Sequence, residues 1–557
     1  MSEDPRGDLA FSSVPGLVAG AAARFGDAEA LVDGDVRLSF SELEAEALRV
    51  TAAAMAAGIT PGDRVAIWAP NMAEWVLAAL GLLGAGAVLV PLNTRFKGPE
   101  AAYVLERSGA KALFSVRGFL GIDYPALLED EDVPDLERIV LLRDADEGTL
   151  SELTRTDEVP IFGWHEFLAG ADGVVEGEGA LVGVRTDEHE VMAAWRAVRP
   201  DDLSDIIFTS GTTGRPKGAM TTHAQTLRTF ATWASVVGLA EGDRYLIVNP
   251  FFHTFGYKAG IVACLLAGAT IVPEPVFDVD RVLEKVAAER ITMLPGPPTL
   301  YQSILDHPRR ADYDLSSLRL AVTGAAAVPV ELILRMRSEL TFSTVLTAYG
   351  LTESTGVVTM CRRGDDPDVI SHTSGRAIPD LEVRIVDESG AARPRGEPGE
   401  IVVRGYTVMA GYFEDPEATA TAIDAEGWLH TGDVGVMDDA GNVTITDRLK
   451  DMFIVGGFNA YPAEIEGTLL RHPGVSQVAV IGVPDPRMGE VGCAFVVPRP
   501  GVDAVELAGA LPVWARGQMA NYKVPRSVEI VEALPLNASG KVLKTVLRAR
   551  ATEGGSR

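Results

Sequence analysis

The segment Thr209-Ser-Gly-Thr-Thr-Gly-Arg-Pro-Lys-Gly218 combines hydroxyl side chains, glycines and two cationic side chains. Glycines let backbone N–H groups approach an anion, and hydroxyls and cations add hydrogen bonds and positive charge to the same loop. The apolar run Ile206-Ile-Phe208 directly before it predicts a buried strand, and a helical pattern follows it. A polar loop in this position predicts an α/β domain that holds a triphosphate.

The residues around this loop distinguish it from the Walker A loop. The Walker A spacing is G-x-x-x-x-G-K-[ST], and Pro216 stands where its second glycine would be. After the loop, Thr222 and Gln225 predict a capping box at the start of a helix that Gly238 ends. The sequence therefore predicts that the phosphate loop lies between a strand and a helix, against the alternative of a mobile polar turn.

Domain organisation is predicted from length and pattern. A chain of 557 residues is expected to form more than one hydrophobic core. Helix-like stretches alternate with short apolar runs in residues 38 to 91 and again after residue 205, which predicts layered α/β structure. The charged segment Thr446-Asp-Arg-Leu-Lys-Asp451 precedes a fresh α/β pattern. We expect a large domain over 1–447, a smaller one over 448–557, and surface loops or a family-variable insertion in the acidic segment 129–200.

Composition limits the partners of this chain. The formal net charge of −29 disfavours nucleic acid and anionic membrane surfaces. Cys264, Cys361 and Cys493 are too few and too far apart for a disulfide framework or a zinc site, which favours a reducing cytoplasm. The strongest apolar run, at residues 78 to 92, is shorter than the roughly 20 residues of a spanning helix. We therefore expect a cytoplasmic enzyme without a transmembrane segment or a secretory signal.

Further motifs follow the loop in order along the chain. They are Asn249-Pro-Phe-Phe-His253, Gly324-Ala-Ala-Ala-Val-Pro329, Tyr349-Gly-Leu-Thr-Glu353, Gly399-Glu-Ile-Val-Val-Arg-Gly405, Trp428-Leu-His-Thr-Gly-Asp433, Asp447-Arg-Leu-Lys-Asp451 and Gly540-Lys541. Together with the loop, these motifs resemble the signatures of the adenylate-forming superfamily, which contains acyl-CoA synthetases, peptide-synthetase adenylation domains and firefly luciferase. The resemblance implies an α/β fold with a large N-terminal domain of several subdomains and a smaller, mobile C-terminal α/β lid.

The resemblance also implies a two-step reaction. A carboxylic acid and ATP form an acyl-adenylate and pyrophosphate, and coenzyme A then takes the acyl group and releases AMP. ATP, Mg²⁺ and coenzyme A are the implied cofactors, and a small carboxylic acid is the implied substrate. Two alternatives keep the adenylate but change the second step: transfer of the acyl group to a carrier protein, and luciferase-like oxygenation. The oligomeric state stays open, a homodimer included.

The residues that hold the nucleotide are implied by the same resemblance. Tyr349 resembles the aromatic residue that stacks on adenine, Thr352 the hydroxyl that holds the α-phosphate, and Asp433 the carboxylate that accepts both ribose hydroxyls. Glu353 resembles the Mg²⁺ ligand, with Thr209 as a second ligand, and hard oxygen ligands suit that ion. The full set of implied cofactor-binding residues is Thr209, Ser210, Gly211, Thr212, Thr213, Gly214, Lys217, Gly324, Ala325, Ala326, Tyr349, Gly350, Asp433, Arg448, Lys450, Gly456 and Gly457.

Several further roles are implied, some with ordinary alternatives. His253 resembles the residue that borders the acyl pocket and the substrate carboxylate, and it also fits a core histidine. Lys541 resembles the catalytic lysine that contacts the substrate carboxylate and the α-phosphate, and it also fits a solvated surface lysine. Lys450 resembles the hinge residue of the lid, against the alternative of a charged linker. Arg448 resembles a cation that reaches the ribose and phosphates, and Gly456-Gly457 resembles the lining of the pantetheine tunnel.

Four segments restrict the range of carboxylic acids that the resemblance implies. Residues 221 to 235, 249 to 260, 294 to 308 and 447 to 464 resemble the actinobacterial ligases that activate the indanedione propionate left from the C and D rings of sterols. This implies a role in steroid catabolism, with a medium- or long-chain fatty acid or another bulky carboxylate as the alternative. Lys258 is a candidate contact for a substrate ketone, and a surface lysine is its alternative.

Lys541→Ala is expected to separate the two half-reactions of the implied mechanism. Loss of the charge should slow adenylation by about 10² to 10³, because the lysine stabilises developing charge in the adenylating pose alone. Thioester formation from presynthesised acyl-AMP and coenzyme A should stay near the wild-type rate. The two rates are measured separately, and normal adenylation would leave Lys541 as a solvated surface residue.

Overall fold

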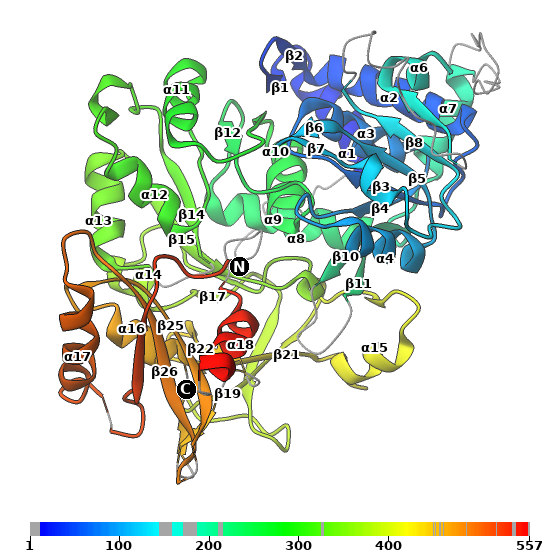
Figure 1. Ribbon diagram of the computed structural model, residues 1–557. Coiled ribbons are helices and arrows are strands. Elements are labelled where there is room, and N and C mark those ends of the chain that lie inside the picture. Colours follow the sequence, from blue (N-terminus) through cyan, green and yellow to red (C-terminus); the bar gives the residue numbers. More distant parts are fainter. Residues whose placement is uncertain are drawn as a thin grey trace.

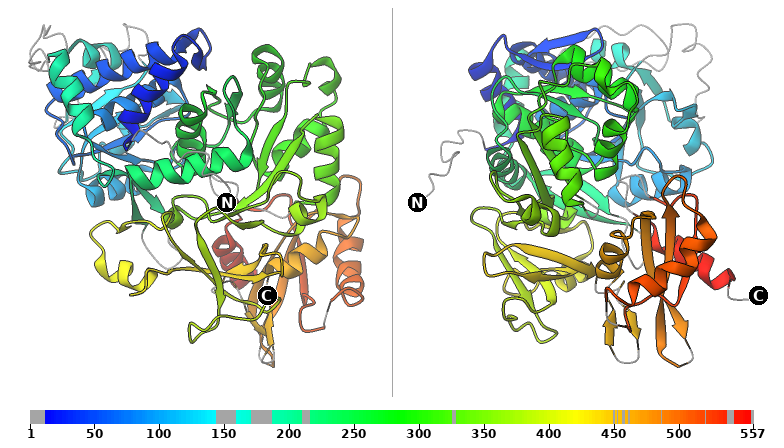
Figure 2. Two further views of the ribbon diagram at one scale, coloured as in Figure 1. Left: turned by 180° about the vertical axis from the view of Figure 1, so that it is seen from behind. Right: turned by 90° about the vertical axis from the view of Figure 1, so that its left-hand side faces the viewer.

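The computed structural model in Figures 1 and 2 is a mixed α/β structure with a large N-terminal part and a smaller C-terminal part. The α/β class predicted from the sequence is confirmed. The residues that the structure describes are 12–143, 159–170, 187–209, 216–324, 328–448, 451, 453–455, 458–460, 462–485, 487–519, 521–536 and 542–554.

An eight-stranded sheet contains β10 and β11, the two strands connected by the predicted phosphate-binding segment Thr209–Gly218 (the phosphate segment). Strand β10 pairs in parallel with β4 and in antiparallel with β11, and β20 adds to β11 in antiparallel pairing. In order across the sheet, the strands are β20 (Gly411–Tyr412), β11 (Lys217–Thr222), β10 (Leu203–Thr209), β4 (Val88–Pro91), β3 (Arg64–Trp68), β5 (Ala110–Ser115), β8 (Arg138–Leu141) and β9 (Ile161–Gly163).

A second sheet system consists of two four-stranded parts that Met293 joins through bridges to Tyr245 and Leu320. The motif Tyr349-Gly-Leu-Thr-Glu353 begins at the last residue of β15, which pairs in parallel with β14. The strands of the two parts are β12 (Arg244–Ile247), β13 (Thr270–Pro273), β1 (Glu29–Asp33) and β2 (Val36–Ser39), and then β14 (Leu320–Thr323), β15 (Thr344–Tyr349), β16 (Thr359–Met360) and β17 (Arg376–Ala377).

Helices cover these sheets, and α1, α2 and α3 pack on one another. The predicted capping box of Thr222 and Gln225 is confirmed at the start of α8, which Gly238 ends in a left-handed conformation. The helices are α1 (Val14–Phe25), α2 (Phe40–Ala56), α3 (Ala73–Gly84), α4 (Gly98–Ser108), η1 (Pro125–Leu128), α6 (Trp164–Ala169), α7 (Glu188–Ala197), α8 (His223–Val237), α9 (Thr254–Gly256), the π-helix η3 (Tyr257–Val262), α10 (Ala263–Ala267), α11 (Val279–Glu289), α12 (Pro298–Leu305), η4 (Arg310–Asp312), α13 (Val330–Glu339), η5 (Thr352–Ser354), α14 (Pro367–His372) and α15 (Pro416–Ala422).

The C-terminal third of the chain forms an antiparallel sheet and then the smaller part, drawn in orange and red in Figure 1. The antiparallel sheet contains β18 (Glu382–Val386), β19 (Gly399–Arg404), β21 (Leu429–Met437) and β22 (Val443–Arg448). The smaller part contains β23 (Phe453–Val455), β24 (Phe458–Ala460), α16 (Pro462–Leu469), β25 (Val475–Asp485), β26 (Gly489–Pro498), α17 (Ala504–Ala515), β27 (Ser527–Ile530) and α18 (Lys544–Gly554). A separate hairpin of β6 (Arg117–Phe119) and β7 (Ile122–Asp123) lies in the larger part.

The two parts have separate hydrophobic cores. One cluster includes both Val14 and Val443 and unites the larger part. Other clusters, with Phe453 and Phe495 among their members, form the cores of the smaller part. Helix α16 contacts β22 at the junction. Among the described residues, no helix is both long and apolar enough to cross a membrane.

Candidate active site

The phosphate segment joins two antiparallel strands, which corrects the predicted strand–loop–helix order. Thr209 at the end of β10 pairs with Lys217 at the start of β11, and helix α8 starts only after β11. The physical reason is that β11 also pairs with β20, so the chain after the segment is extended rather than helical. The α8 N-terminus therefore does not adjoin the segment. Ser210, Gly211, Thr212, Thr213 and Gly214 lie outside the described residues.

Glu353 lies beside this hairpin and is held from two sides. Its carboxylate oxygen Oε1 accepts hydrogen bonds from the Thr209 hydroxyl at 3.3 Å and from the Tyr412 hydroxyl at 2.9 Å. Its backbone oxygen accepts a hydrogen bond from the N–H of Met409 at 2.9 Å. The fold thus brings together Thr209 and Glu353, the two residues expected from the sequence to bind the metal. Charge-assisted hydrogen bonds of this kind fix a carboxylate more firmly than neutral ones.

Tyr349 and Asp433 meet in the interior of the larger part. The Tyr349 hydroxyl donates to Asp433 Oδ2 at 2.7 Å, and both residues are buried. Gly350 follows Tyr349 where the chain folds back, and a Cβ there would lie 2.1 Å from the backbone oxygen of Gly356. A side chain at position 350 would therefore displace the loop that leads to Thr352.

The turn before Asp433 is fixed by a small network of hydrogen bonds. The Thr431 hydroxyl accepts the N–H of Asp433 at 3.1 Å and donates to the Ile401 oxygen at 2.7 Å. Glu400 accepts the N–H of Gly432 at 3.0 Å and lies 2.8 Å from His430 Nδ1. These bonds hold the backbone that presents the Asp433 carboxylate.

Two further predicted nucleotide contacts are partly located. Gly324 follows β14, and the backbone of Arg448 pairs with Asp433 across β21 and β22. The side chain of Arg448 is not among those described, and Ala325, Ala326, Lys450, Gly456, Gly457 and Lys541 lie outside the described residues.

His253 caps the short helix α9 and is half-buried. Its Nδ1 accepts the N–H of Phe255 at 3.2 Å, so in the neutral ring the proton lies on Nε2. The Phe255 ring lies edge-on to Trp233 of α8, with ring centroids 6.3 Å apart. His253 therefore belongs to a turn that packs on α8, the helix that follows the phosphate hairpin.

Lys258 is buried, which corrects both expectations for this residue. Its Nζ lies 2.9 Å from Asp205 Oδ1, and both side chains are at most 1% exposed. Asp205 Oδ2 also accepts the Ser204 hydroxyl at 2.7 Å. Burial lowers the pKa of Lys258, and the neighbouring Asp205 carboxylate opposes this shift. The surface alternative is wrong, and so is the expected ketone contact, because the ammonium is already paired in the interior.

Sequence reasoning missed Tyr412 and Asp205. Tyr412 reaches Glu353 because β20 pairs with β11, and its ring lies 5.1 Å from Lys217 Nζ. Asp205 of β10 pairs with Lys258 of η3, which is distant from it in the sequence. Positions 204 to 207 of β10 are all buried, so the carboxylate of Asp205 needs a partner there, but no local sequence pattern identifies that partner.

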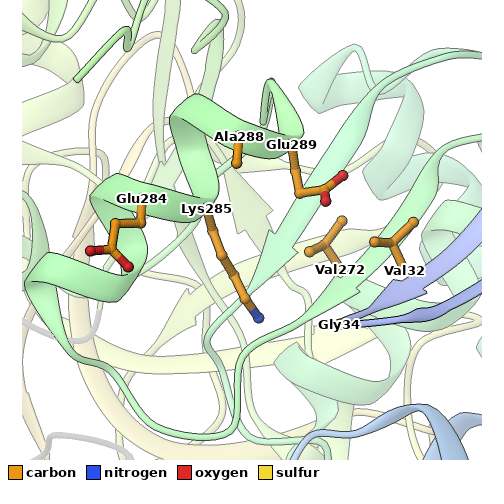
Figure 3. Close-up of a pocket in the computed structure, with 7 residues that line it drawn as sticks. All are labelled: Val32, Gly34, Val272, Glu284, Lys285, Ala288 and Glu289. Carbon is orange, nitrogen blue, oxygen red and sulfur yellow. The ribbon is translucent and has the colours of Figure 1, made fainter.

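Figure 3 shows a surface hollow whose lining differs from the site residues described above. It lies between α11 and the strands β1 and β13, and Lys285, one of its lining residues, donates to the Pro273 oxygen and pairs with Glu274 at 2.8 Å. None of the predicted site residues that the structure describes lines this hollow, whose lining residues are Val32, Gly34, Val272, Glu284, Lys285, Ala288 and Glu289.

Comparison with known proteins assigns both parts of the chain. Residues 18–413 match the model described as AMP-binding enzyme, and residues 464–541 match the AMP-binding enzyme C-terminal domain. The chain is 52% identical over 552 residues, covering 98% of this chain and 99% of the relative, to the 3-[(3aS,4S,7aS)-7a-methyl-1,5-dioxo-octahydro-1H-inden-4-yl]propanoyl:CoA ligase of Rhodococcus jostii. It is 51% identical to the protein of the same name from Mycobacterium tuberculosis, over 94% of this chain and 96% of the relative.

Solved structures agree with this assignment. The crystal structure of an anthranilate CoA ligase in complex with anthranoyl-AMP superposes with a TM-score of 0.82 at 27% identity, over 98% of both chains. ATP-bound MatB from Rhodopseudomonas palustris superposes with a TM-score of 0.78 at 30% identity, over 97% of this chain and 99% of that one.

Replacing Lys258 with Met should destabilise the protein by about 3–5 kcal/mol, because Asp205 would be left as a buried and unpaired charge. Adding Asp205→Leu should restore part of this loss, since neither charge then remains. Thermal unfolding of the single and double variants measures the coupling.

Lys285→Met is the matched control for this cycle. It removes one of two cations from the buried Glu274, which keeps its ion pair with Arg281, so a smaller loss is expected. A Lys258→Met protein as stable as the wild type would contradict the buried pair.

Proposed function

This chain belongs to the AMP-binding enzyme family, and we propose from that premise that its acid is a bicyclic keto acid of the indanedione propionate class. The protein is an ATP-dependent acyl-CoA ligase. The observation that carries the substrate assignment is the similarity to the two indanedione propionate ligases, which extends over nearly the whole length of each. The proposed setting is the breakdown of sterol rings.

The reaction proceeds in two displacements. A carboxylate oxygen of the acid attacks the α-phosphorus of ATP, and the bond to pyrophosphate breaks. The thiol sulfur of coenzyme A then attacks the acyl carbon, the bond to AMP breaks, and the thiol proton is released. The carboxylate is already a nucleophile at neutral pH, so the first step depends on positioning and charge neutralisation rather than on a general base.

The described residues supply binding groups for the first step. Lys217 and Thr209, at the two ends of the hairpin segment, flank the proposed triphosphate site. Tyr349 and Asp433 are proposed to hold the adenine and the ribose, and their mutual hydrogen bond fixes the carboxylate before the nucleotide binds. His253 is proposed to border the acyl pocket, and Thr352 to hold the α-phosphate.

The residues present suit a magnesium ion carried with ATP. The Glu353 carboxylate and the Thr209 hydroxyl offer hard oxygen ligands, which Mg²⁺ prefers. Among the described residues, no group of three or more His, Cys, Asp or Glu side chains gathers to hold a metal. An ion at this site would therefore take its other ligands from phosphate oxygens and water, and it would neutralise phosphate charge.

The smaller part is proposed to act as the lid. Pairing between β21 and β22 ends at Asp433 and Arg448, so the proposed hinge at Lys450 begins just after the chain leaves the sheet. Gly456-Gly457 is proposed to line the pantetheine path and Lys541 to serve adenylation. The separate cores of the two parts support this proposal, because a domain with its own core can move as a unit.

A panel of acids with and without coenzyme A tests the proposed substrate. The indanedione propionate should show a kcat/KM at least about tenfold above that of a straight-chain fatty acid of equal carbon number, since a pocket shaped for a rigid bicycle gains binding energy that a flexible chain does not. Pyrophosphate release measures the first step, and AMP release that depends on coenzyme A measures the second. A preference for the straight chain would refute the proposed acid. Pyrophosphate release without thioester formation would favour a carrier protein as the acceptor.

A further inference from the structure

We propose that Tyr412 is a positioning residue for the nucleotide site. Its hydroxyl hydrogen-bonds to the Glu353 carboxylate, and its ring contacts the Lys217 ammonium. The phosphate-binding cation and the metal-binding carboxylate therefore stay separate and available to their ligands. The inference rests on the proposed function, because it takes Glu353 as the magnesium ligand and Lys217 as a phosphate ligand.

The contacts of Tyr412 reach both charged groups at once. Its hydroxyl donates to Glu353 Oε1 at 2.9 Å, and Lys217 Nζ lies 5.1 Å from the centroid of its ring. That separation is within the roughly 6 Å range of a cation–π interaction. A phenol keeps its proton at neutral pH, so the Tyr412 hydroxyl can donate to the carboxylate.

The backbone of Tyr412 is fixed on both sides. Tyr412 pairs with Ala219 across β20 and β11, and the next residue, Phe413, donates its N–H to the Gly218 oxygen at 2.8 Å. The N–H of Tyr412 itself donates to the Thr419 hydroxyl at 2.9 Å. Because Lys217 begins the strand that β20 pairs with, the ring and the ammonium are set by one sheet register.

In this proposal, Tyr412 contacts both opposite charges and so keeps them from forming a direct ion pair. Among the described residues, neither Lys217 nor Glu353 takes part in an ion pair, although both flank the same hairpin. A direct pair would occupy both groups, and Mg²⁺ and ATP would then have to break it before binding. Tyr412 and Thr209 both donate to Oε1, so Oε2 is the oxygen that the described residues leave to a cation.

Tyr412→Phe tests the hydroxyl separately from the ring. Groups that orient a metal ligand typically change metal affinity by about 10- to 100-fold when they are removed. We expect the dissociation constant of Mn²⁺, measured by electron paramagnetic resonance with a non-hydrolysable ATP analogue bound, to rise about tenfold. The Mg²⁺ concentration for half-maximal adenylation should rise in parallel, while kcat at saturating Mg²⁺ and the KM for the acid change little.

Tyr412→Leu tests the ring. It removes the surface that holds the Lys217 ammonium, so the dissociation constant of the ATP analogue measured without metal should rise above that of Tyr412→Phe. Equal metal-free affinities of these two variants would overturn the role of the ring.

Tyr406→Phe is the matched control, because Tyr406 lies in the same segment and makes the same types of contact elsewhere. Its hydroxyl donates to the Pro379 oxygen at 3.0 Å, and the Arg228 guanidinium lies 4.1 Å from its ring centroid. This variant should leave the Mn²⁺ affinity unchanged. A loss equal to that of Tyr412→Phe would overturn the inference.

Glu353→Gln distinguishes the failure of this inference from a failure of the proposed metal site. It should weaken Mn²⁺ binding at least as much as Tyr412→Phe, and adding Tyr412→Phe to it should have no further effect. If Glu353→Gln weakens Mn²⁺ binding and Tyr412→Phe does not, the positioning role is overturned and the metal site stands. If Glu353→Gln leaves Mn²⁺ binding unchanged, the metal site itself is wrong and the inference falls with it.

Discussion

The antiparallel pairing of β10 with β11 is the constraint on which the site depends. It sets Thr209 opposite Lys217 at the two ends of the phosphate segment. On one side of this hairpin, β11 pairs with β20 and so fixes the position of Tyr412. On the other side, β10 pairs with β4 of the large sheet. Four residues further inside, Asp205 anchors Lys258 and thus the helix that follows His253. A single hairpin thereby links the phosphate segment, the carboxylate proposed to bind the metal and the segment proposed to line the acyl pocket.

Electrostatics explains why Lys217 lies beside an aromatic ring whereas Lys258 is paired with a carboxylate. A chain with a formal net charge of −29 repels ATP, the acid and coenzyme A at long range, so binding depends on cations presented locally. Lys217, the proposed phosphate ligand, can meet that need only if no carboxylate neutralises it, and the aromatic ring of Tyr412 lies beside it without carrying charge. The buried pair of Lys258 and Asp205 is a different case. Desolvation makes such a pair a poor source of stability, and the pair joins β10 to η3 in the interior.

The larger and smaller parts have separate hydrophobic cores, which permits the different roles proposed for them. The groups that meet in the larger part, Glu353 with Thr209 and Tyr349 with Asp433, are joined by hydrogen bonds within one continuous core. The smaller part has cores of its own, so the proposed movement of the lid leaves those bonds intact. This separation suits a reaction in which one preformed nucleotide site serves two successive steps.

The sequence by itself determined the family, the α/β class and the capping of α8, because each is written in local residue chemistry: hydroxyls and glycines in a loop, alternating apolar runs, a threonine three residues before a glutamine. It also implied, through the resemblance to the family, that Thr209 and Glu353 act together at one metal site. Tertiary structure alone decided that the phosphate segment joins two antiparallel strands, that Lys258 is buried, and that Tyr412 contacts Glu353. These features depend on strand pairing between segments that are distant in the chain, as when β20 adds to β11. Local periodicity shows that a residue is in a strand or in the interior, but the partner across a sheet is set by the packing of the whole fold.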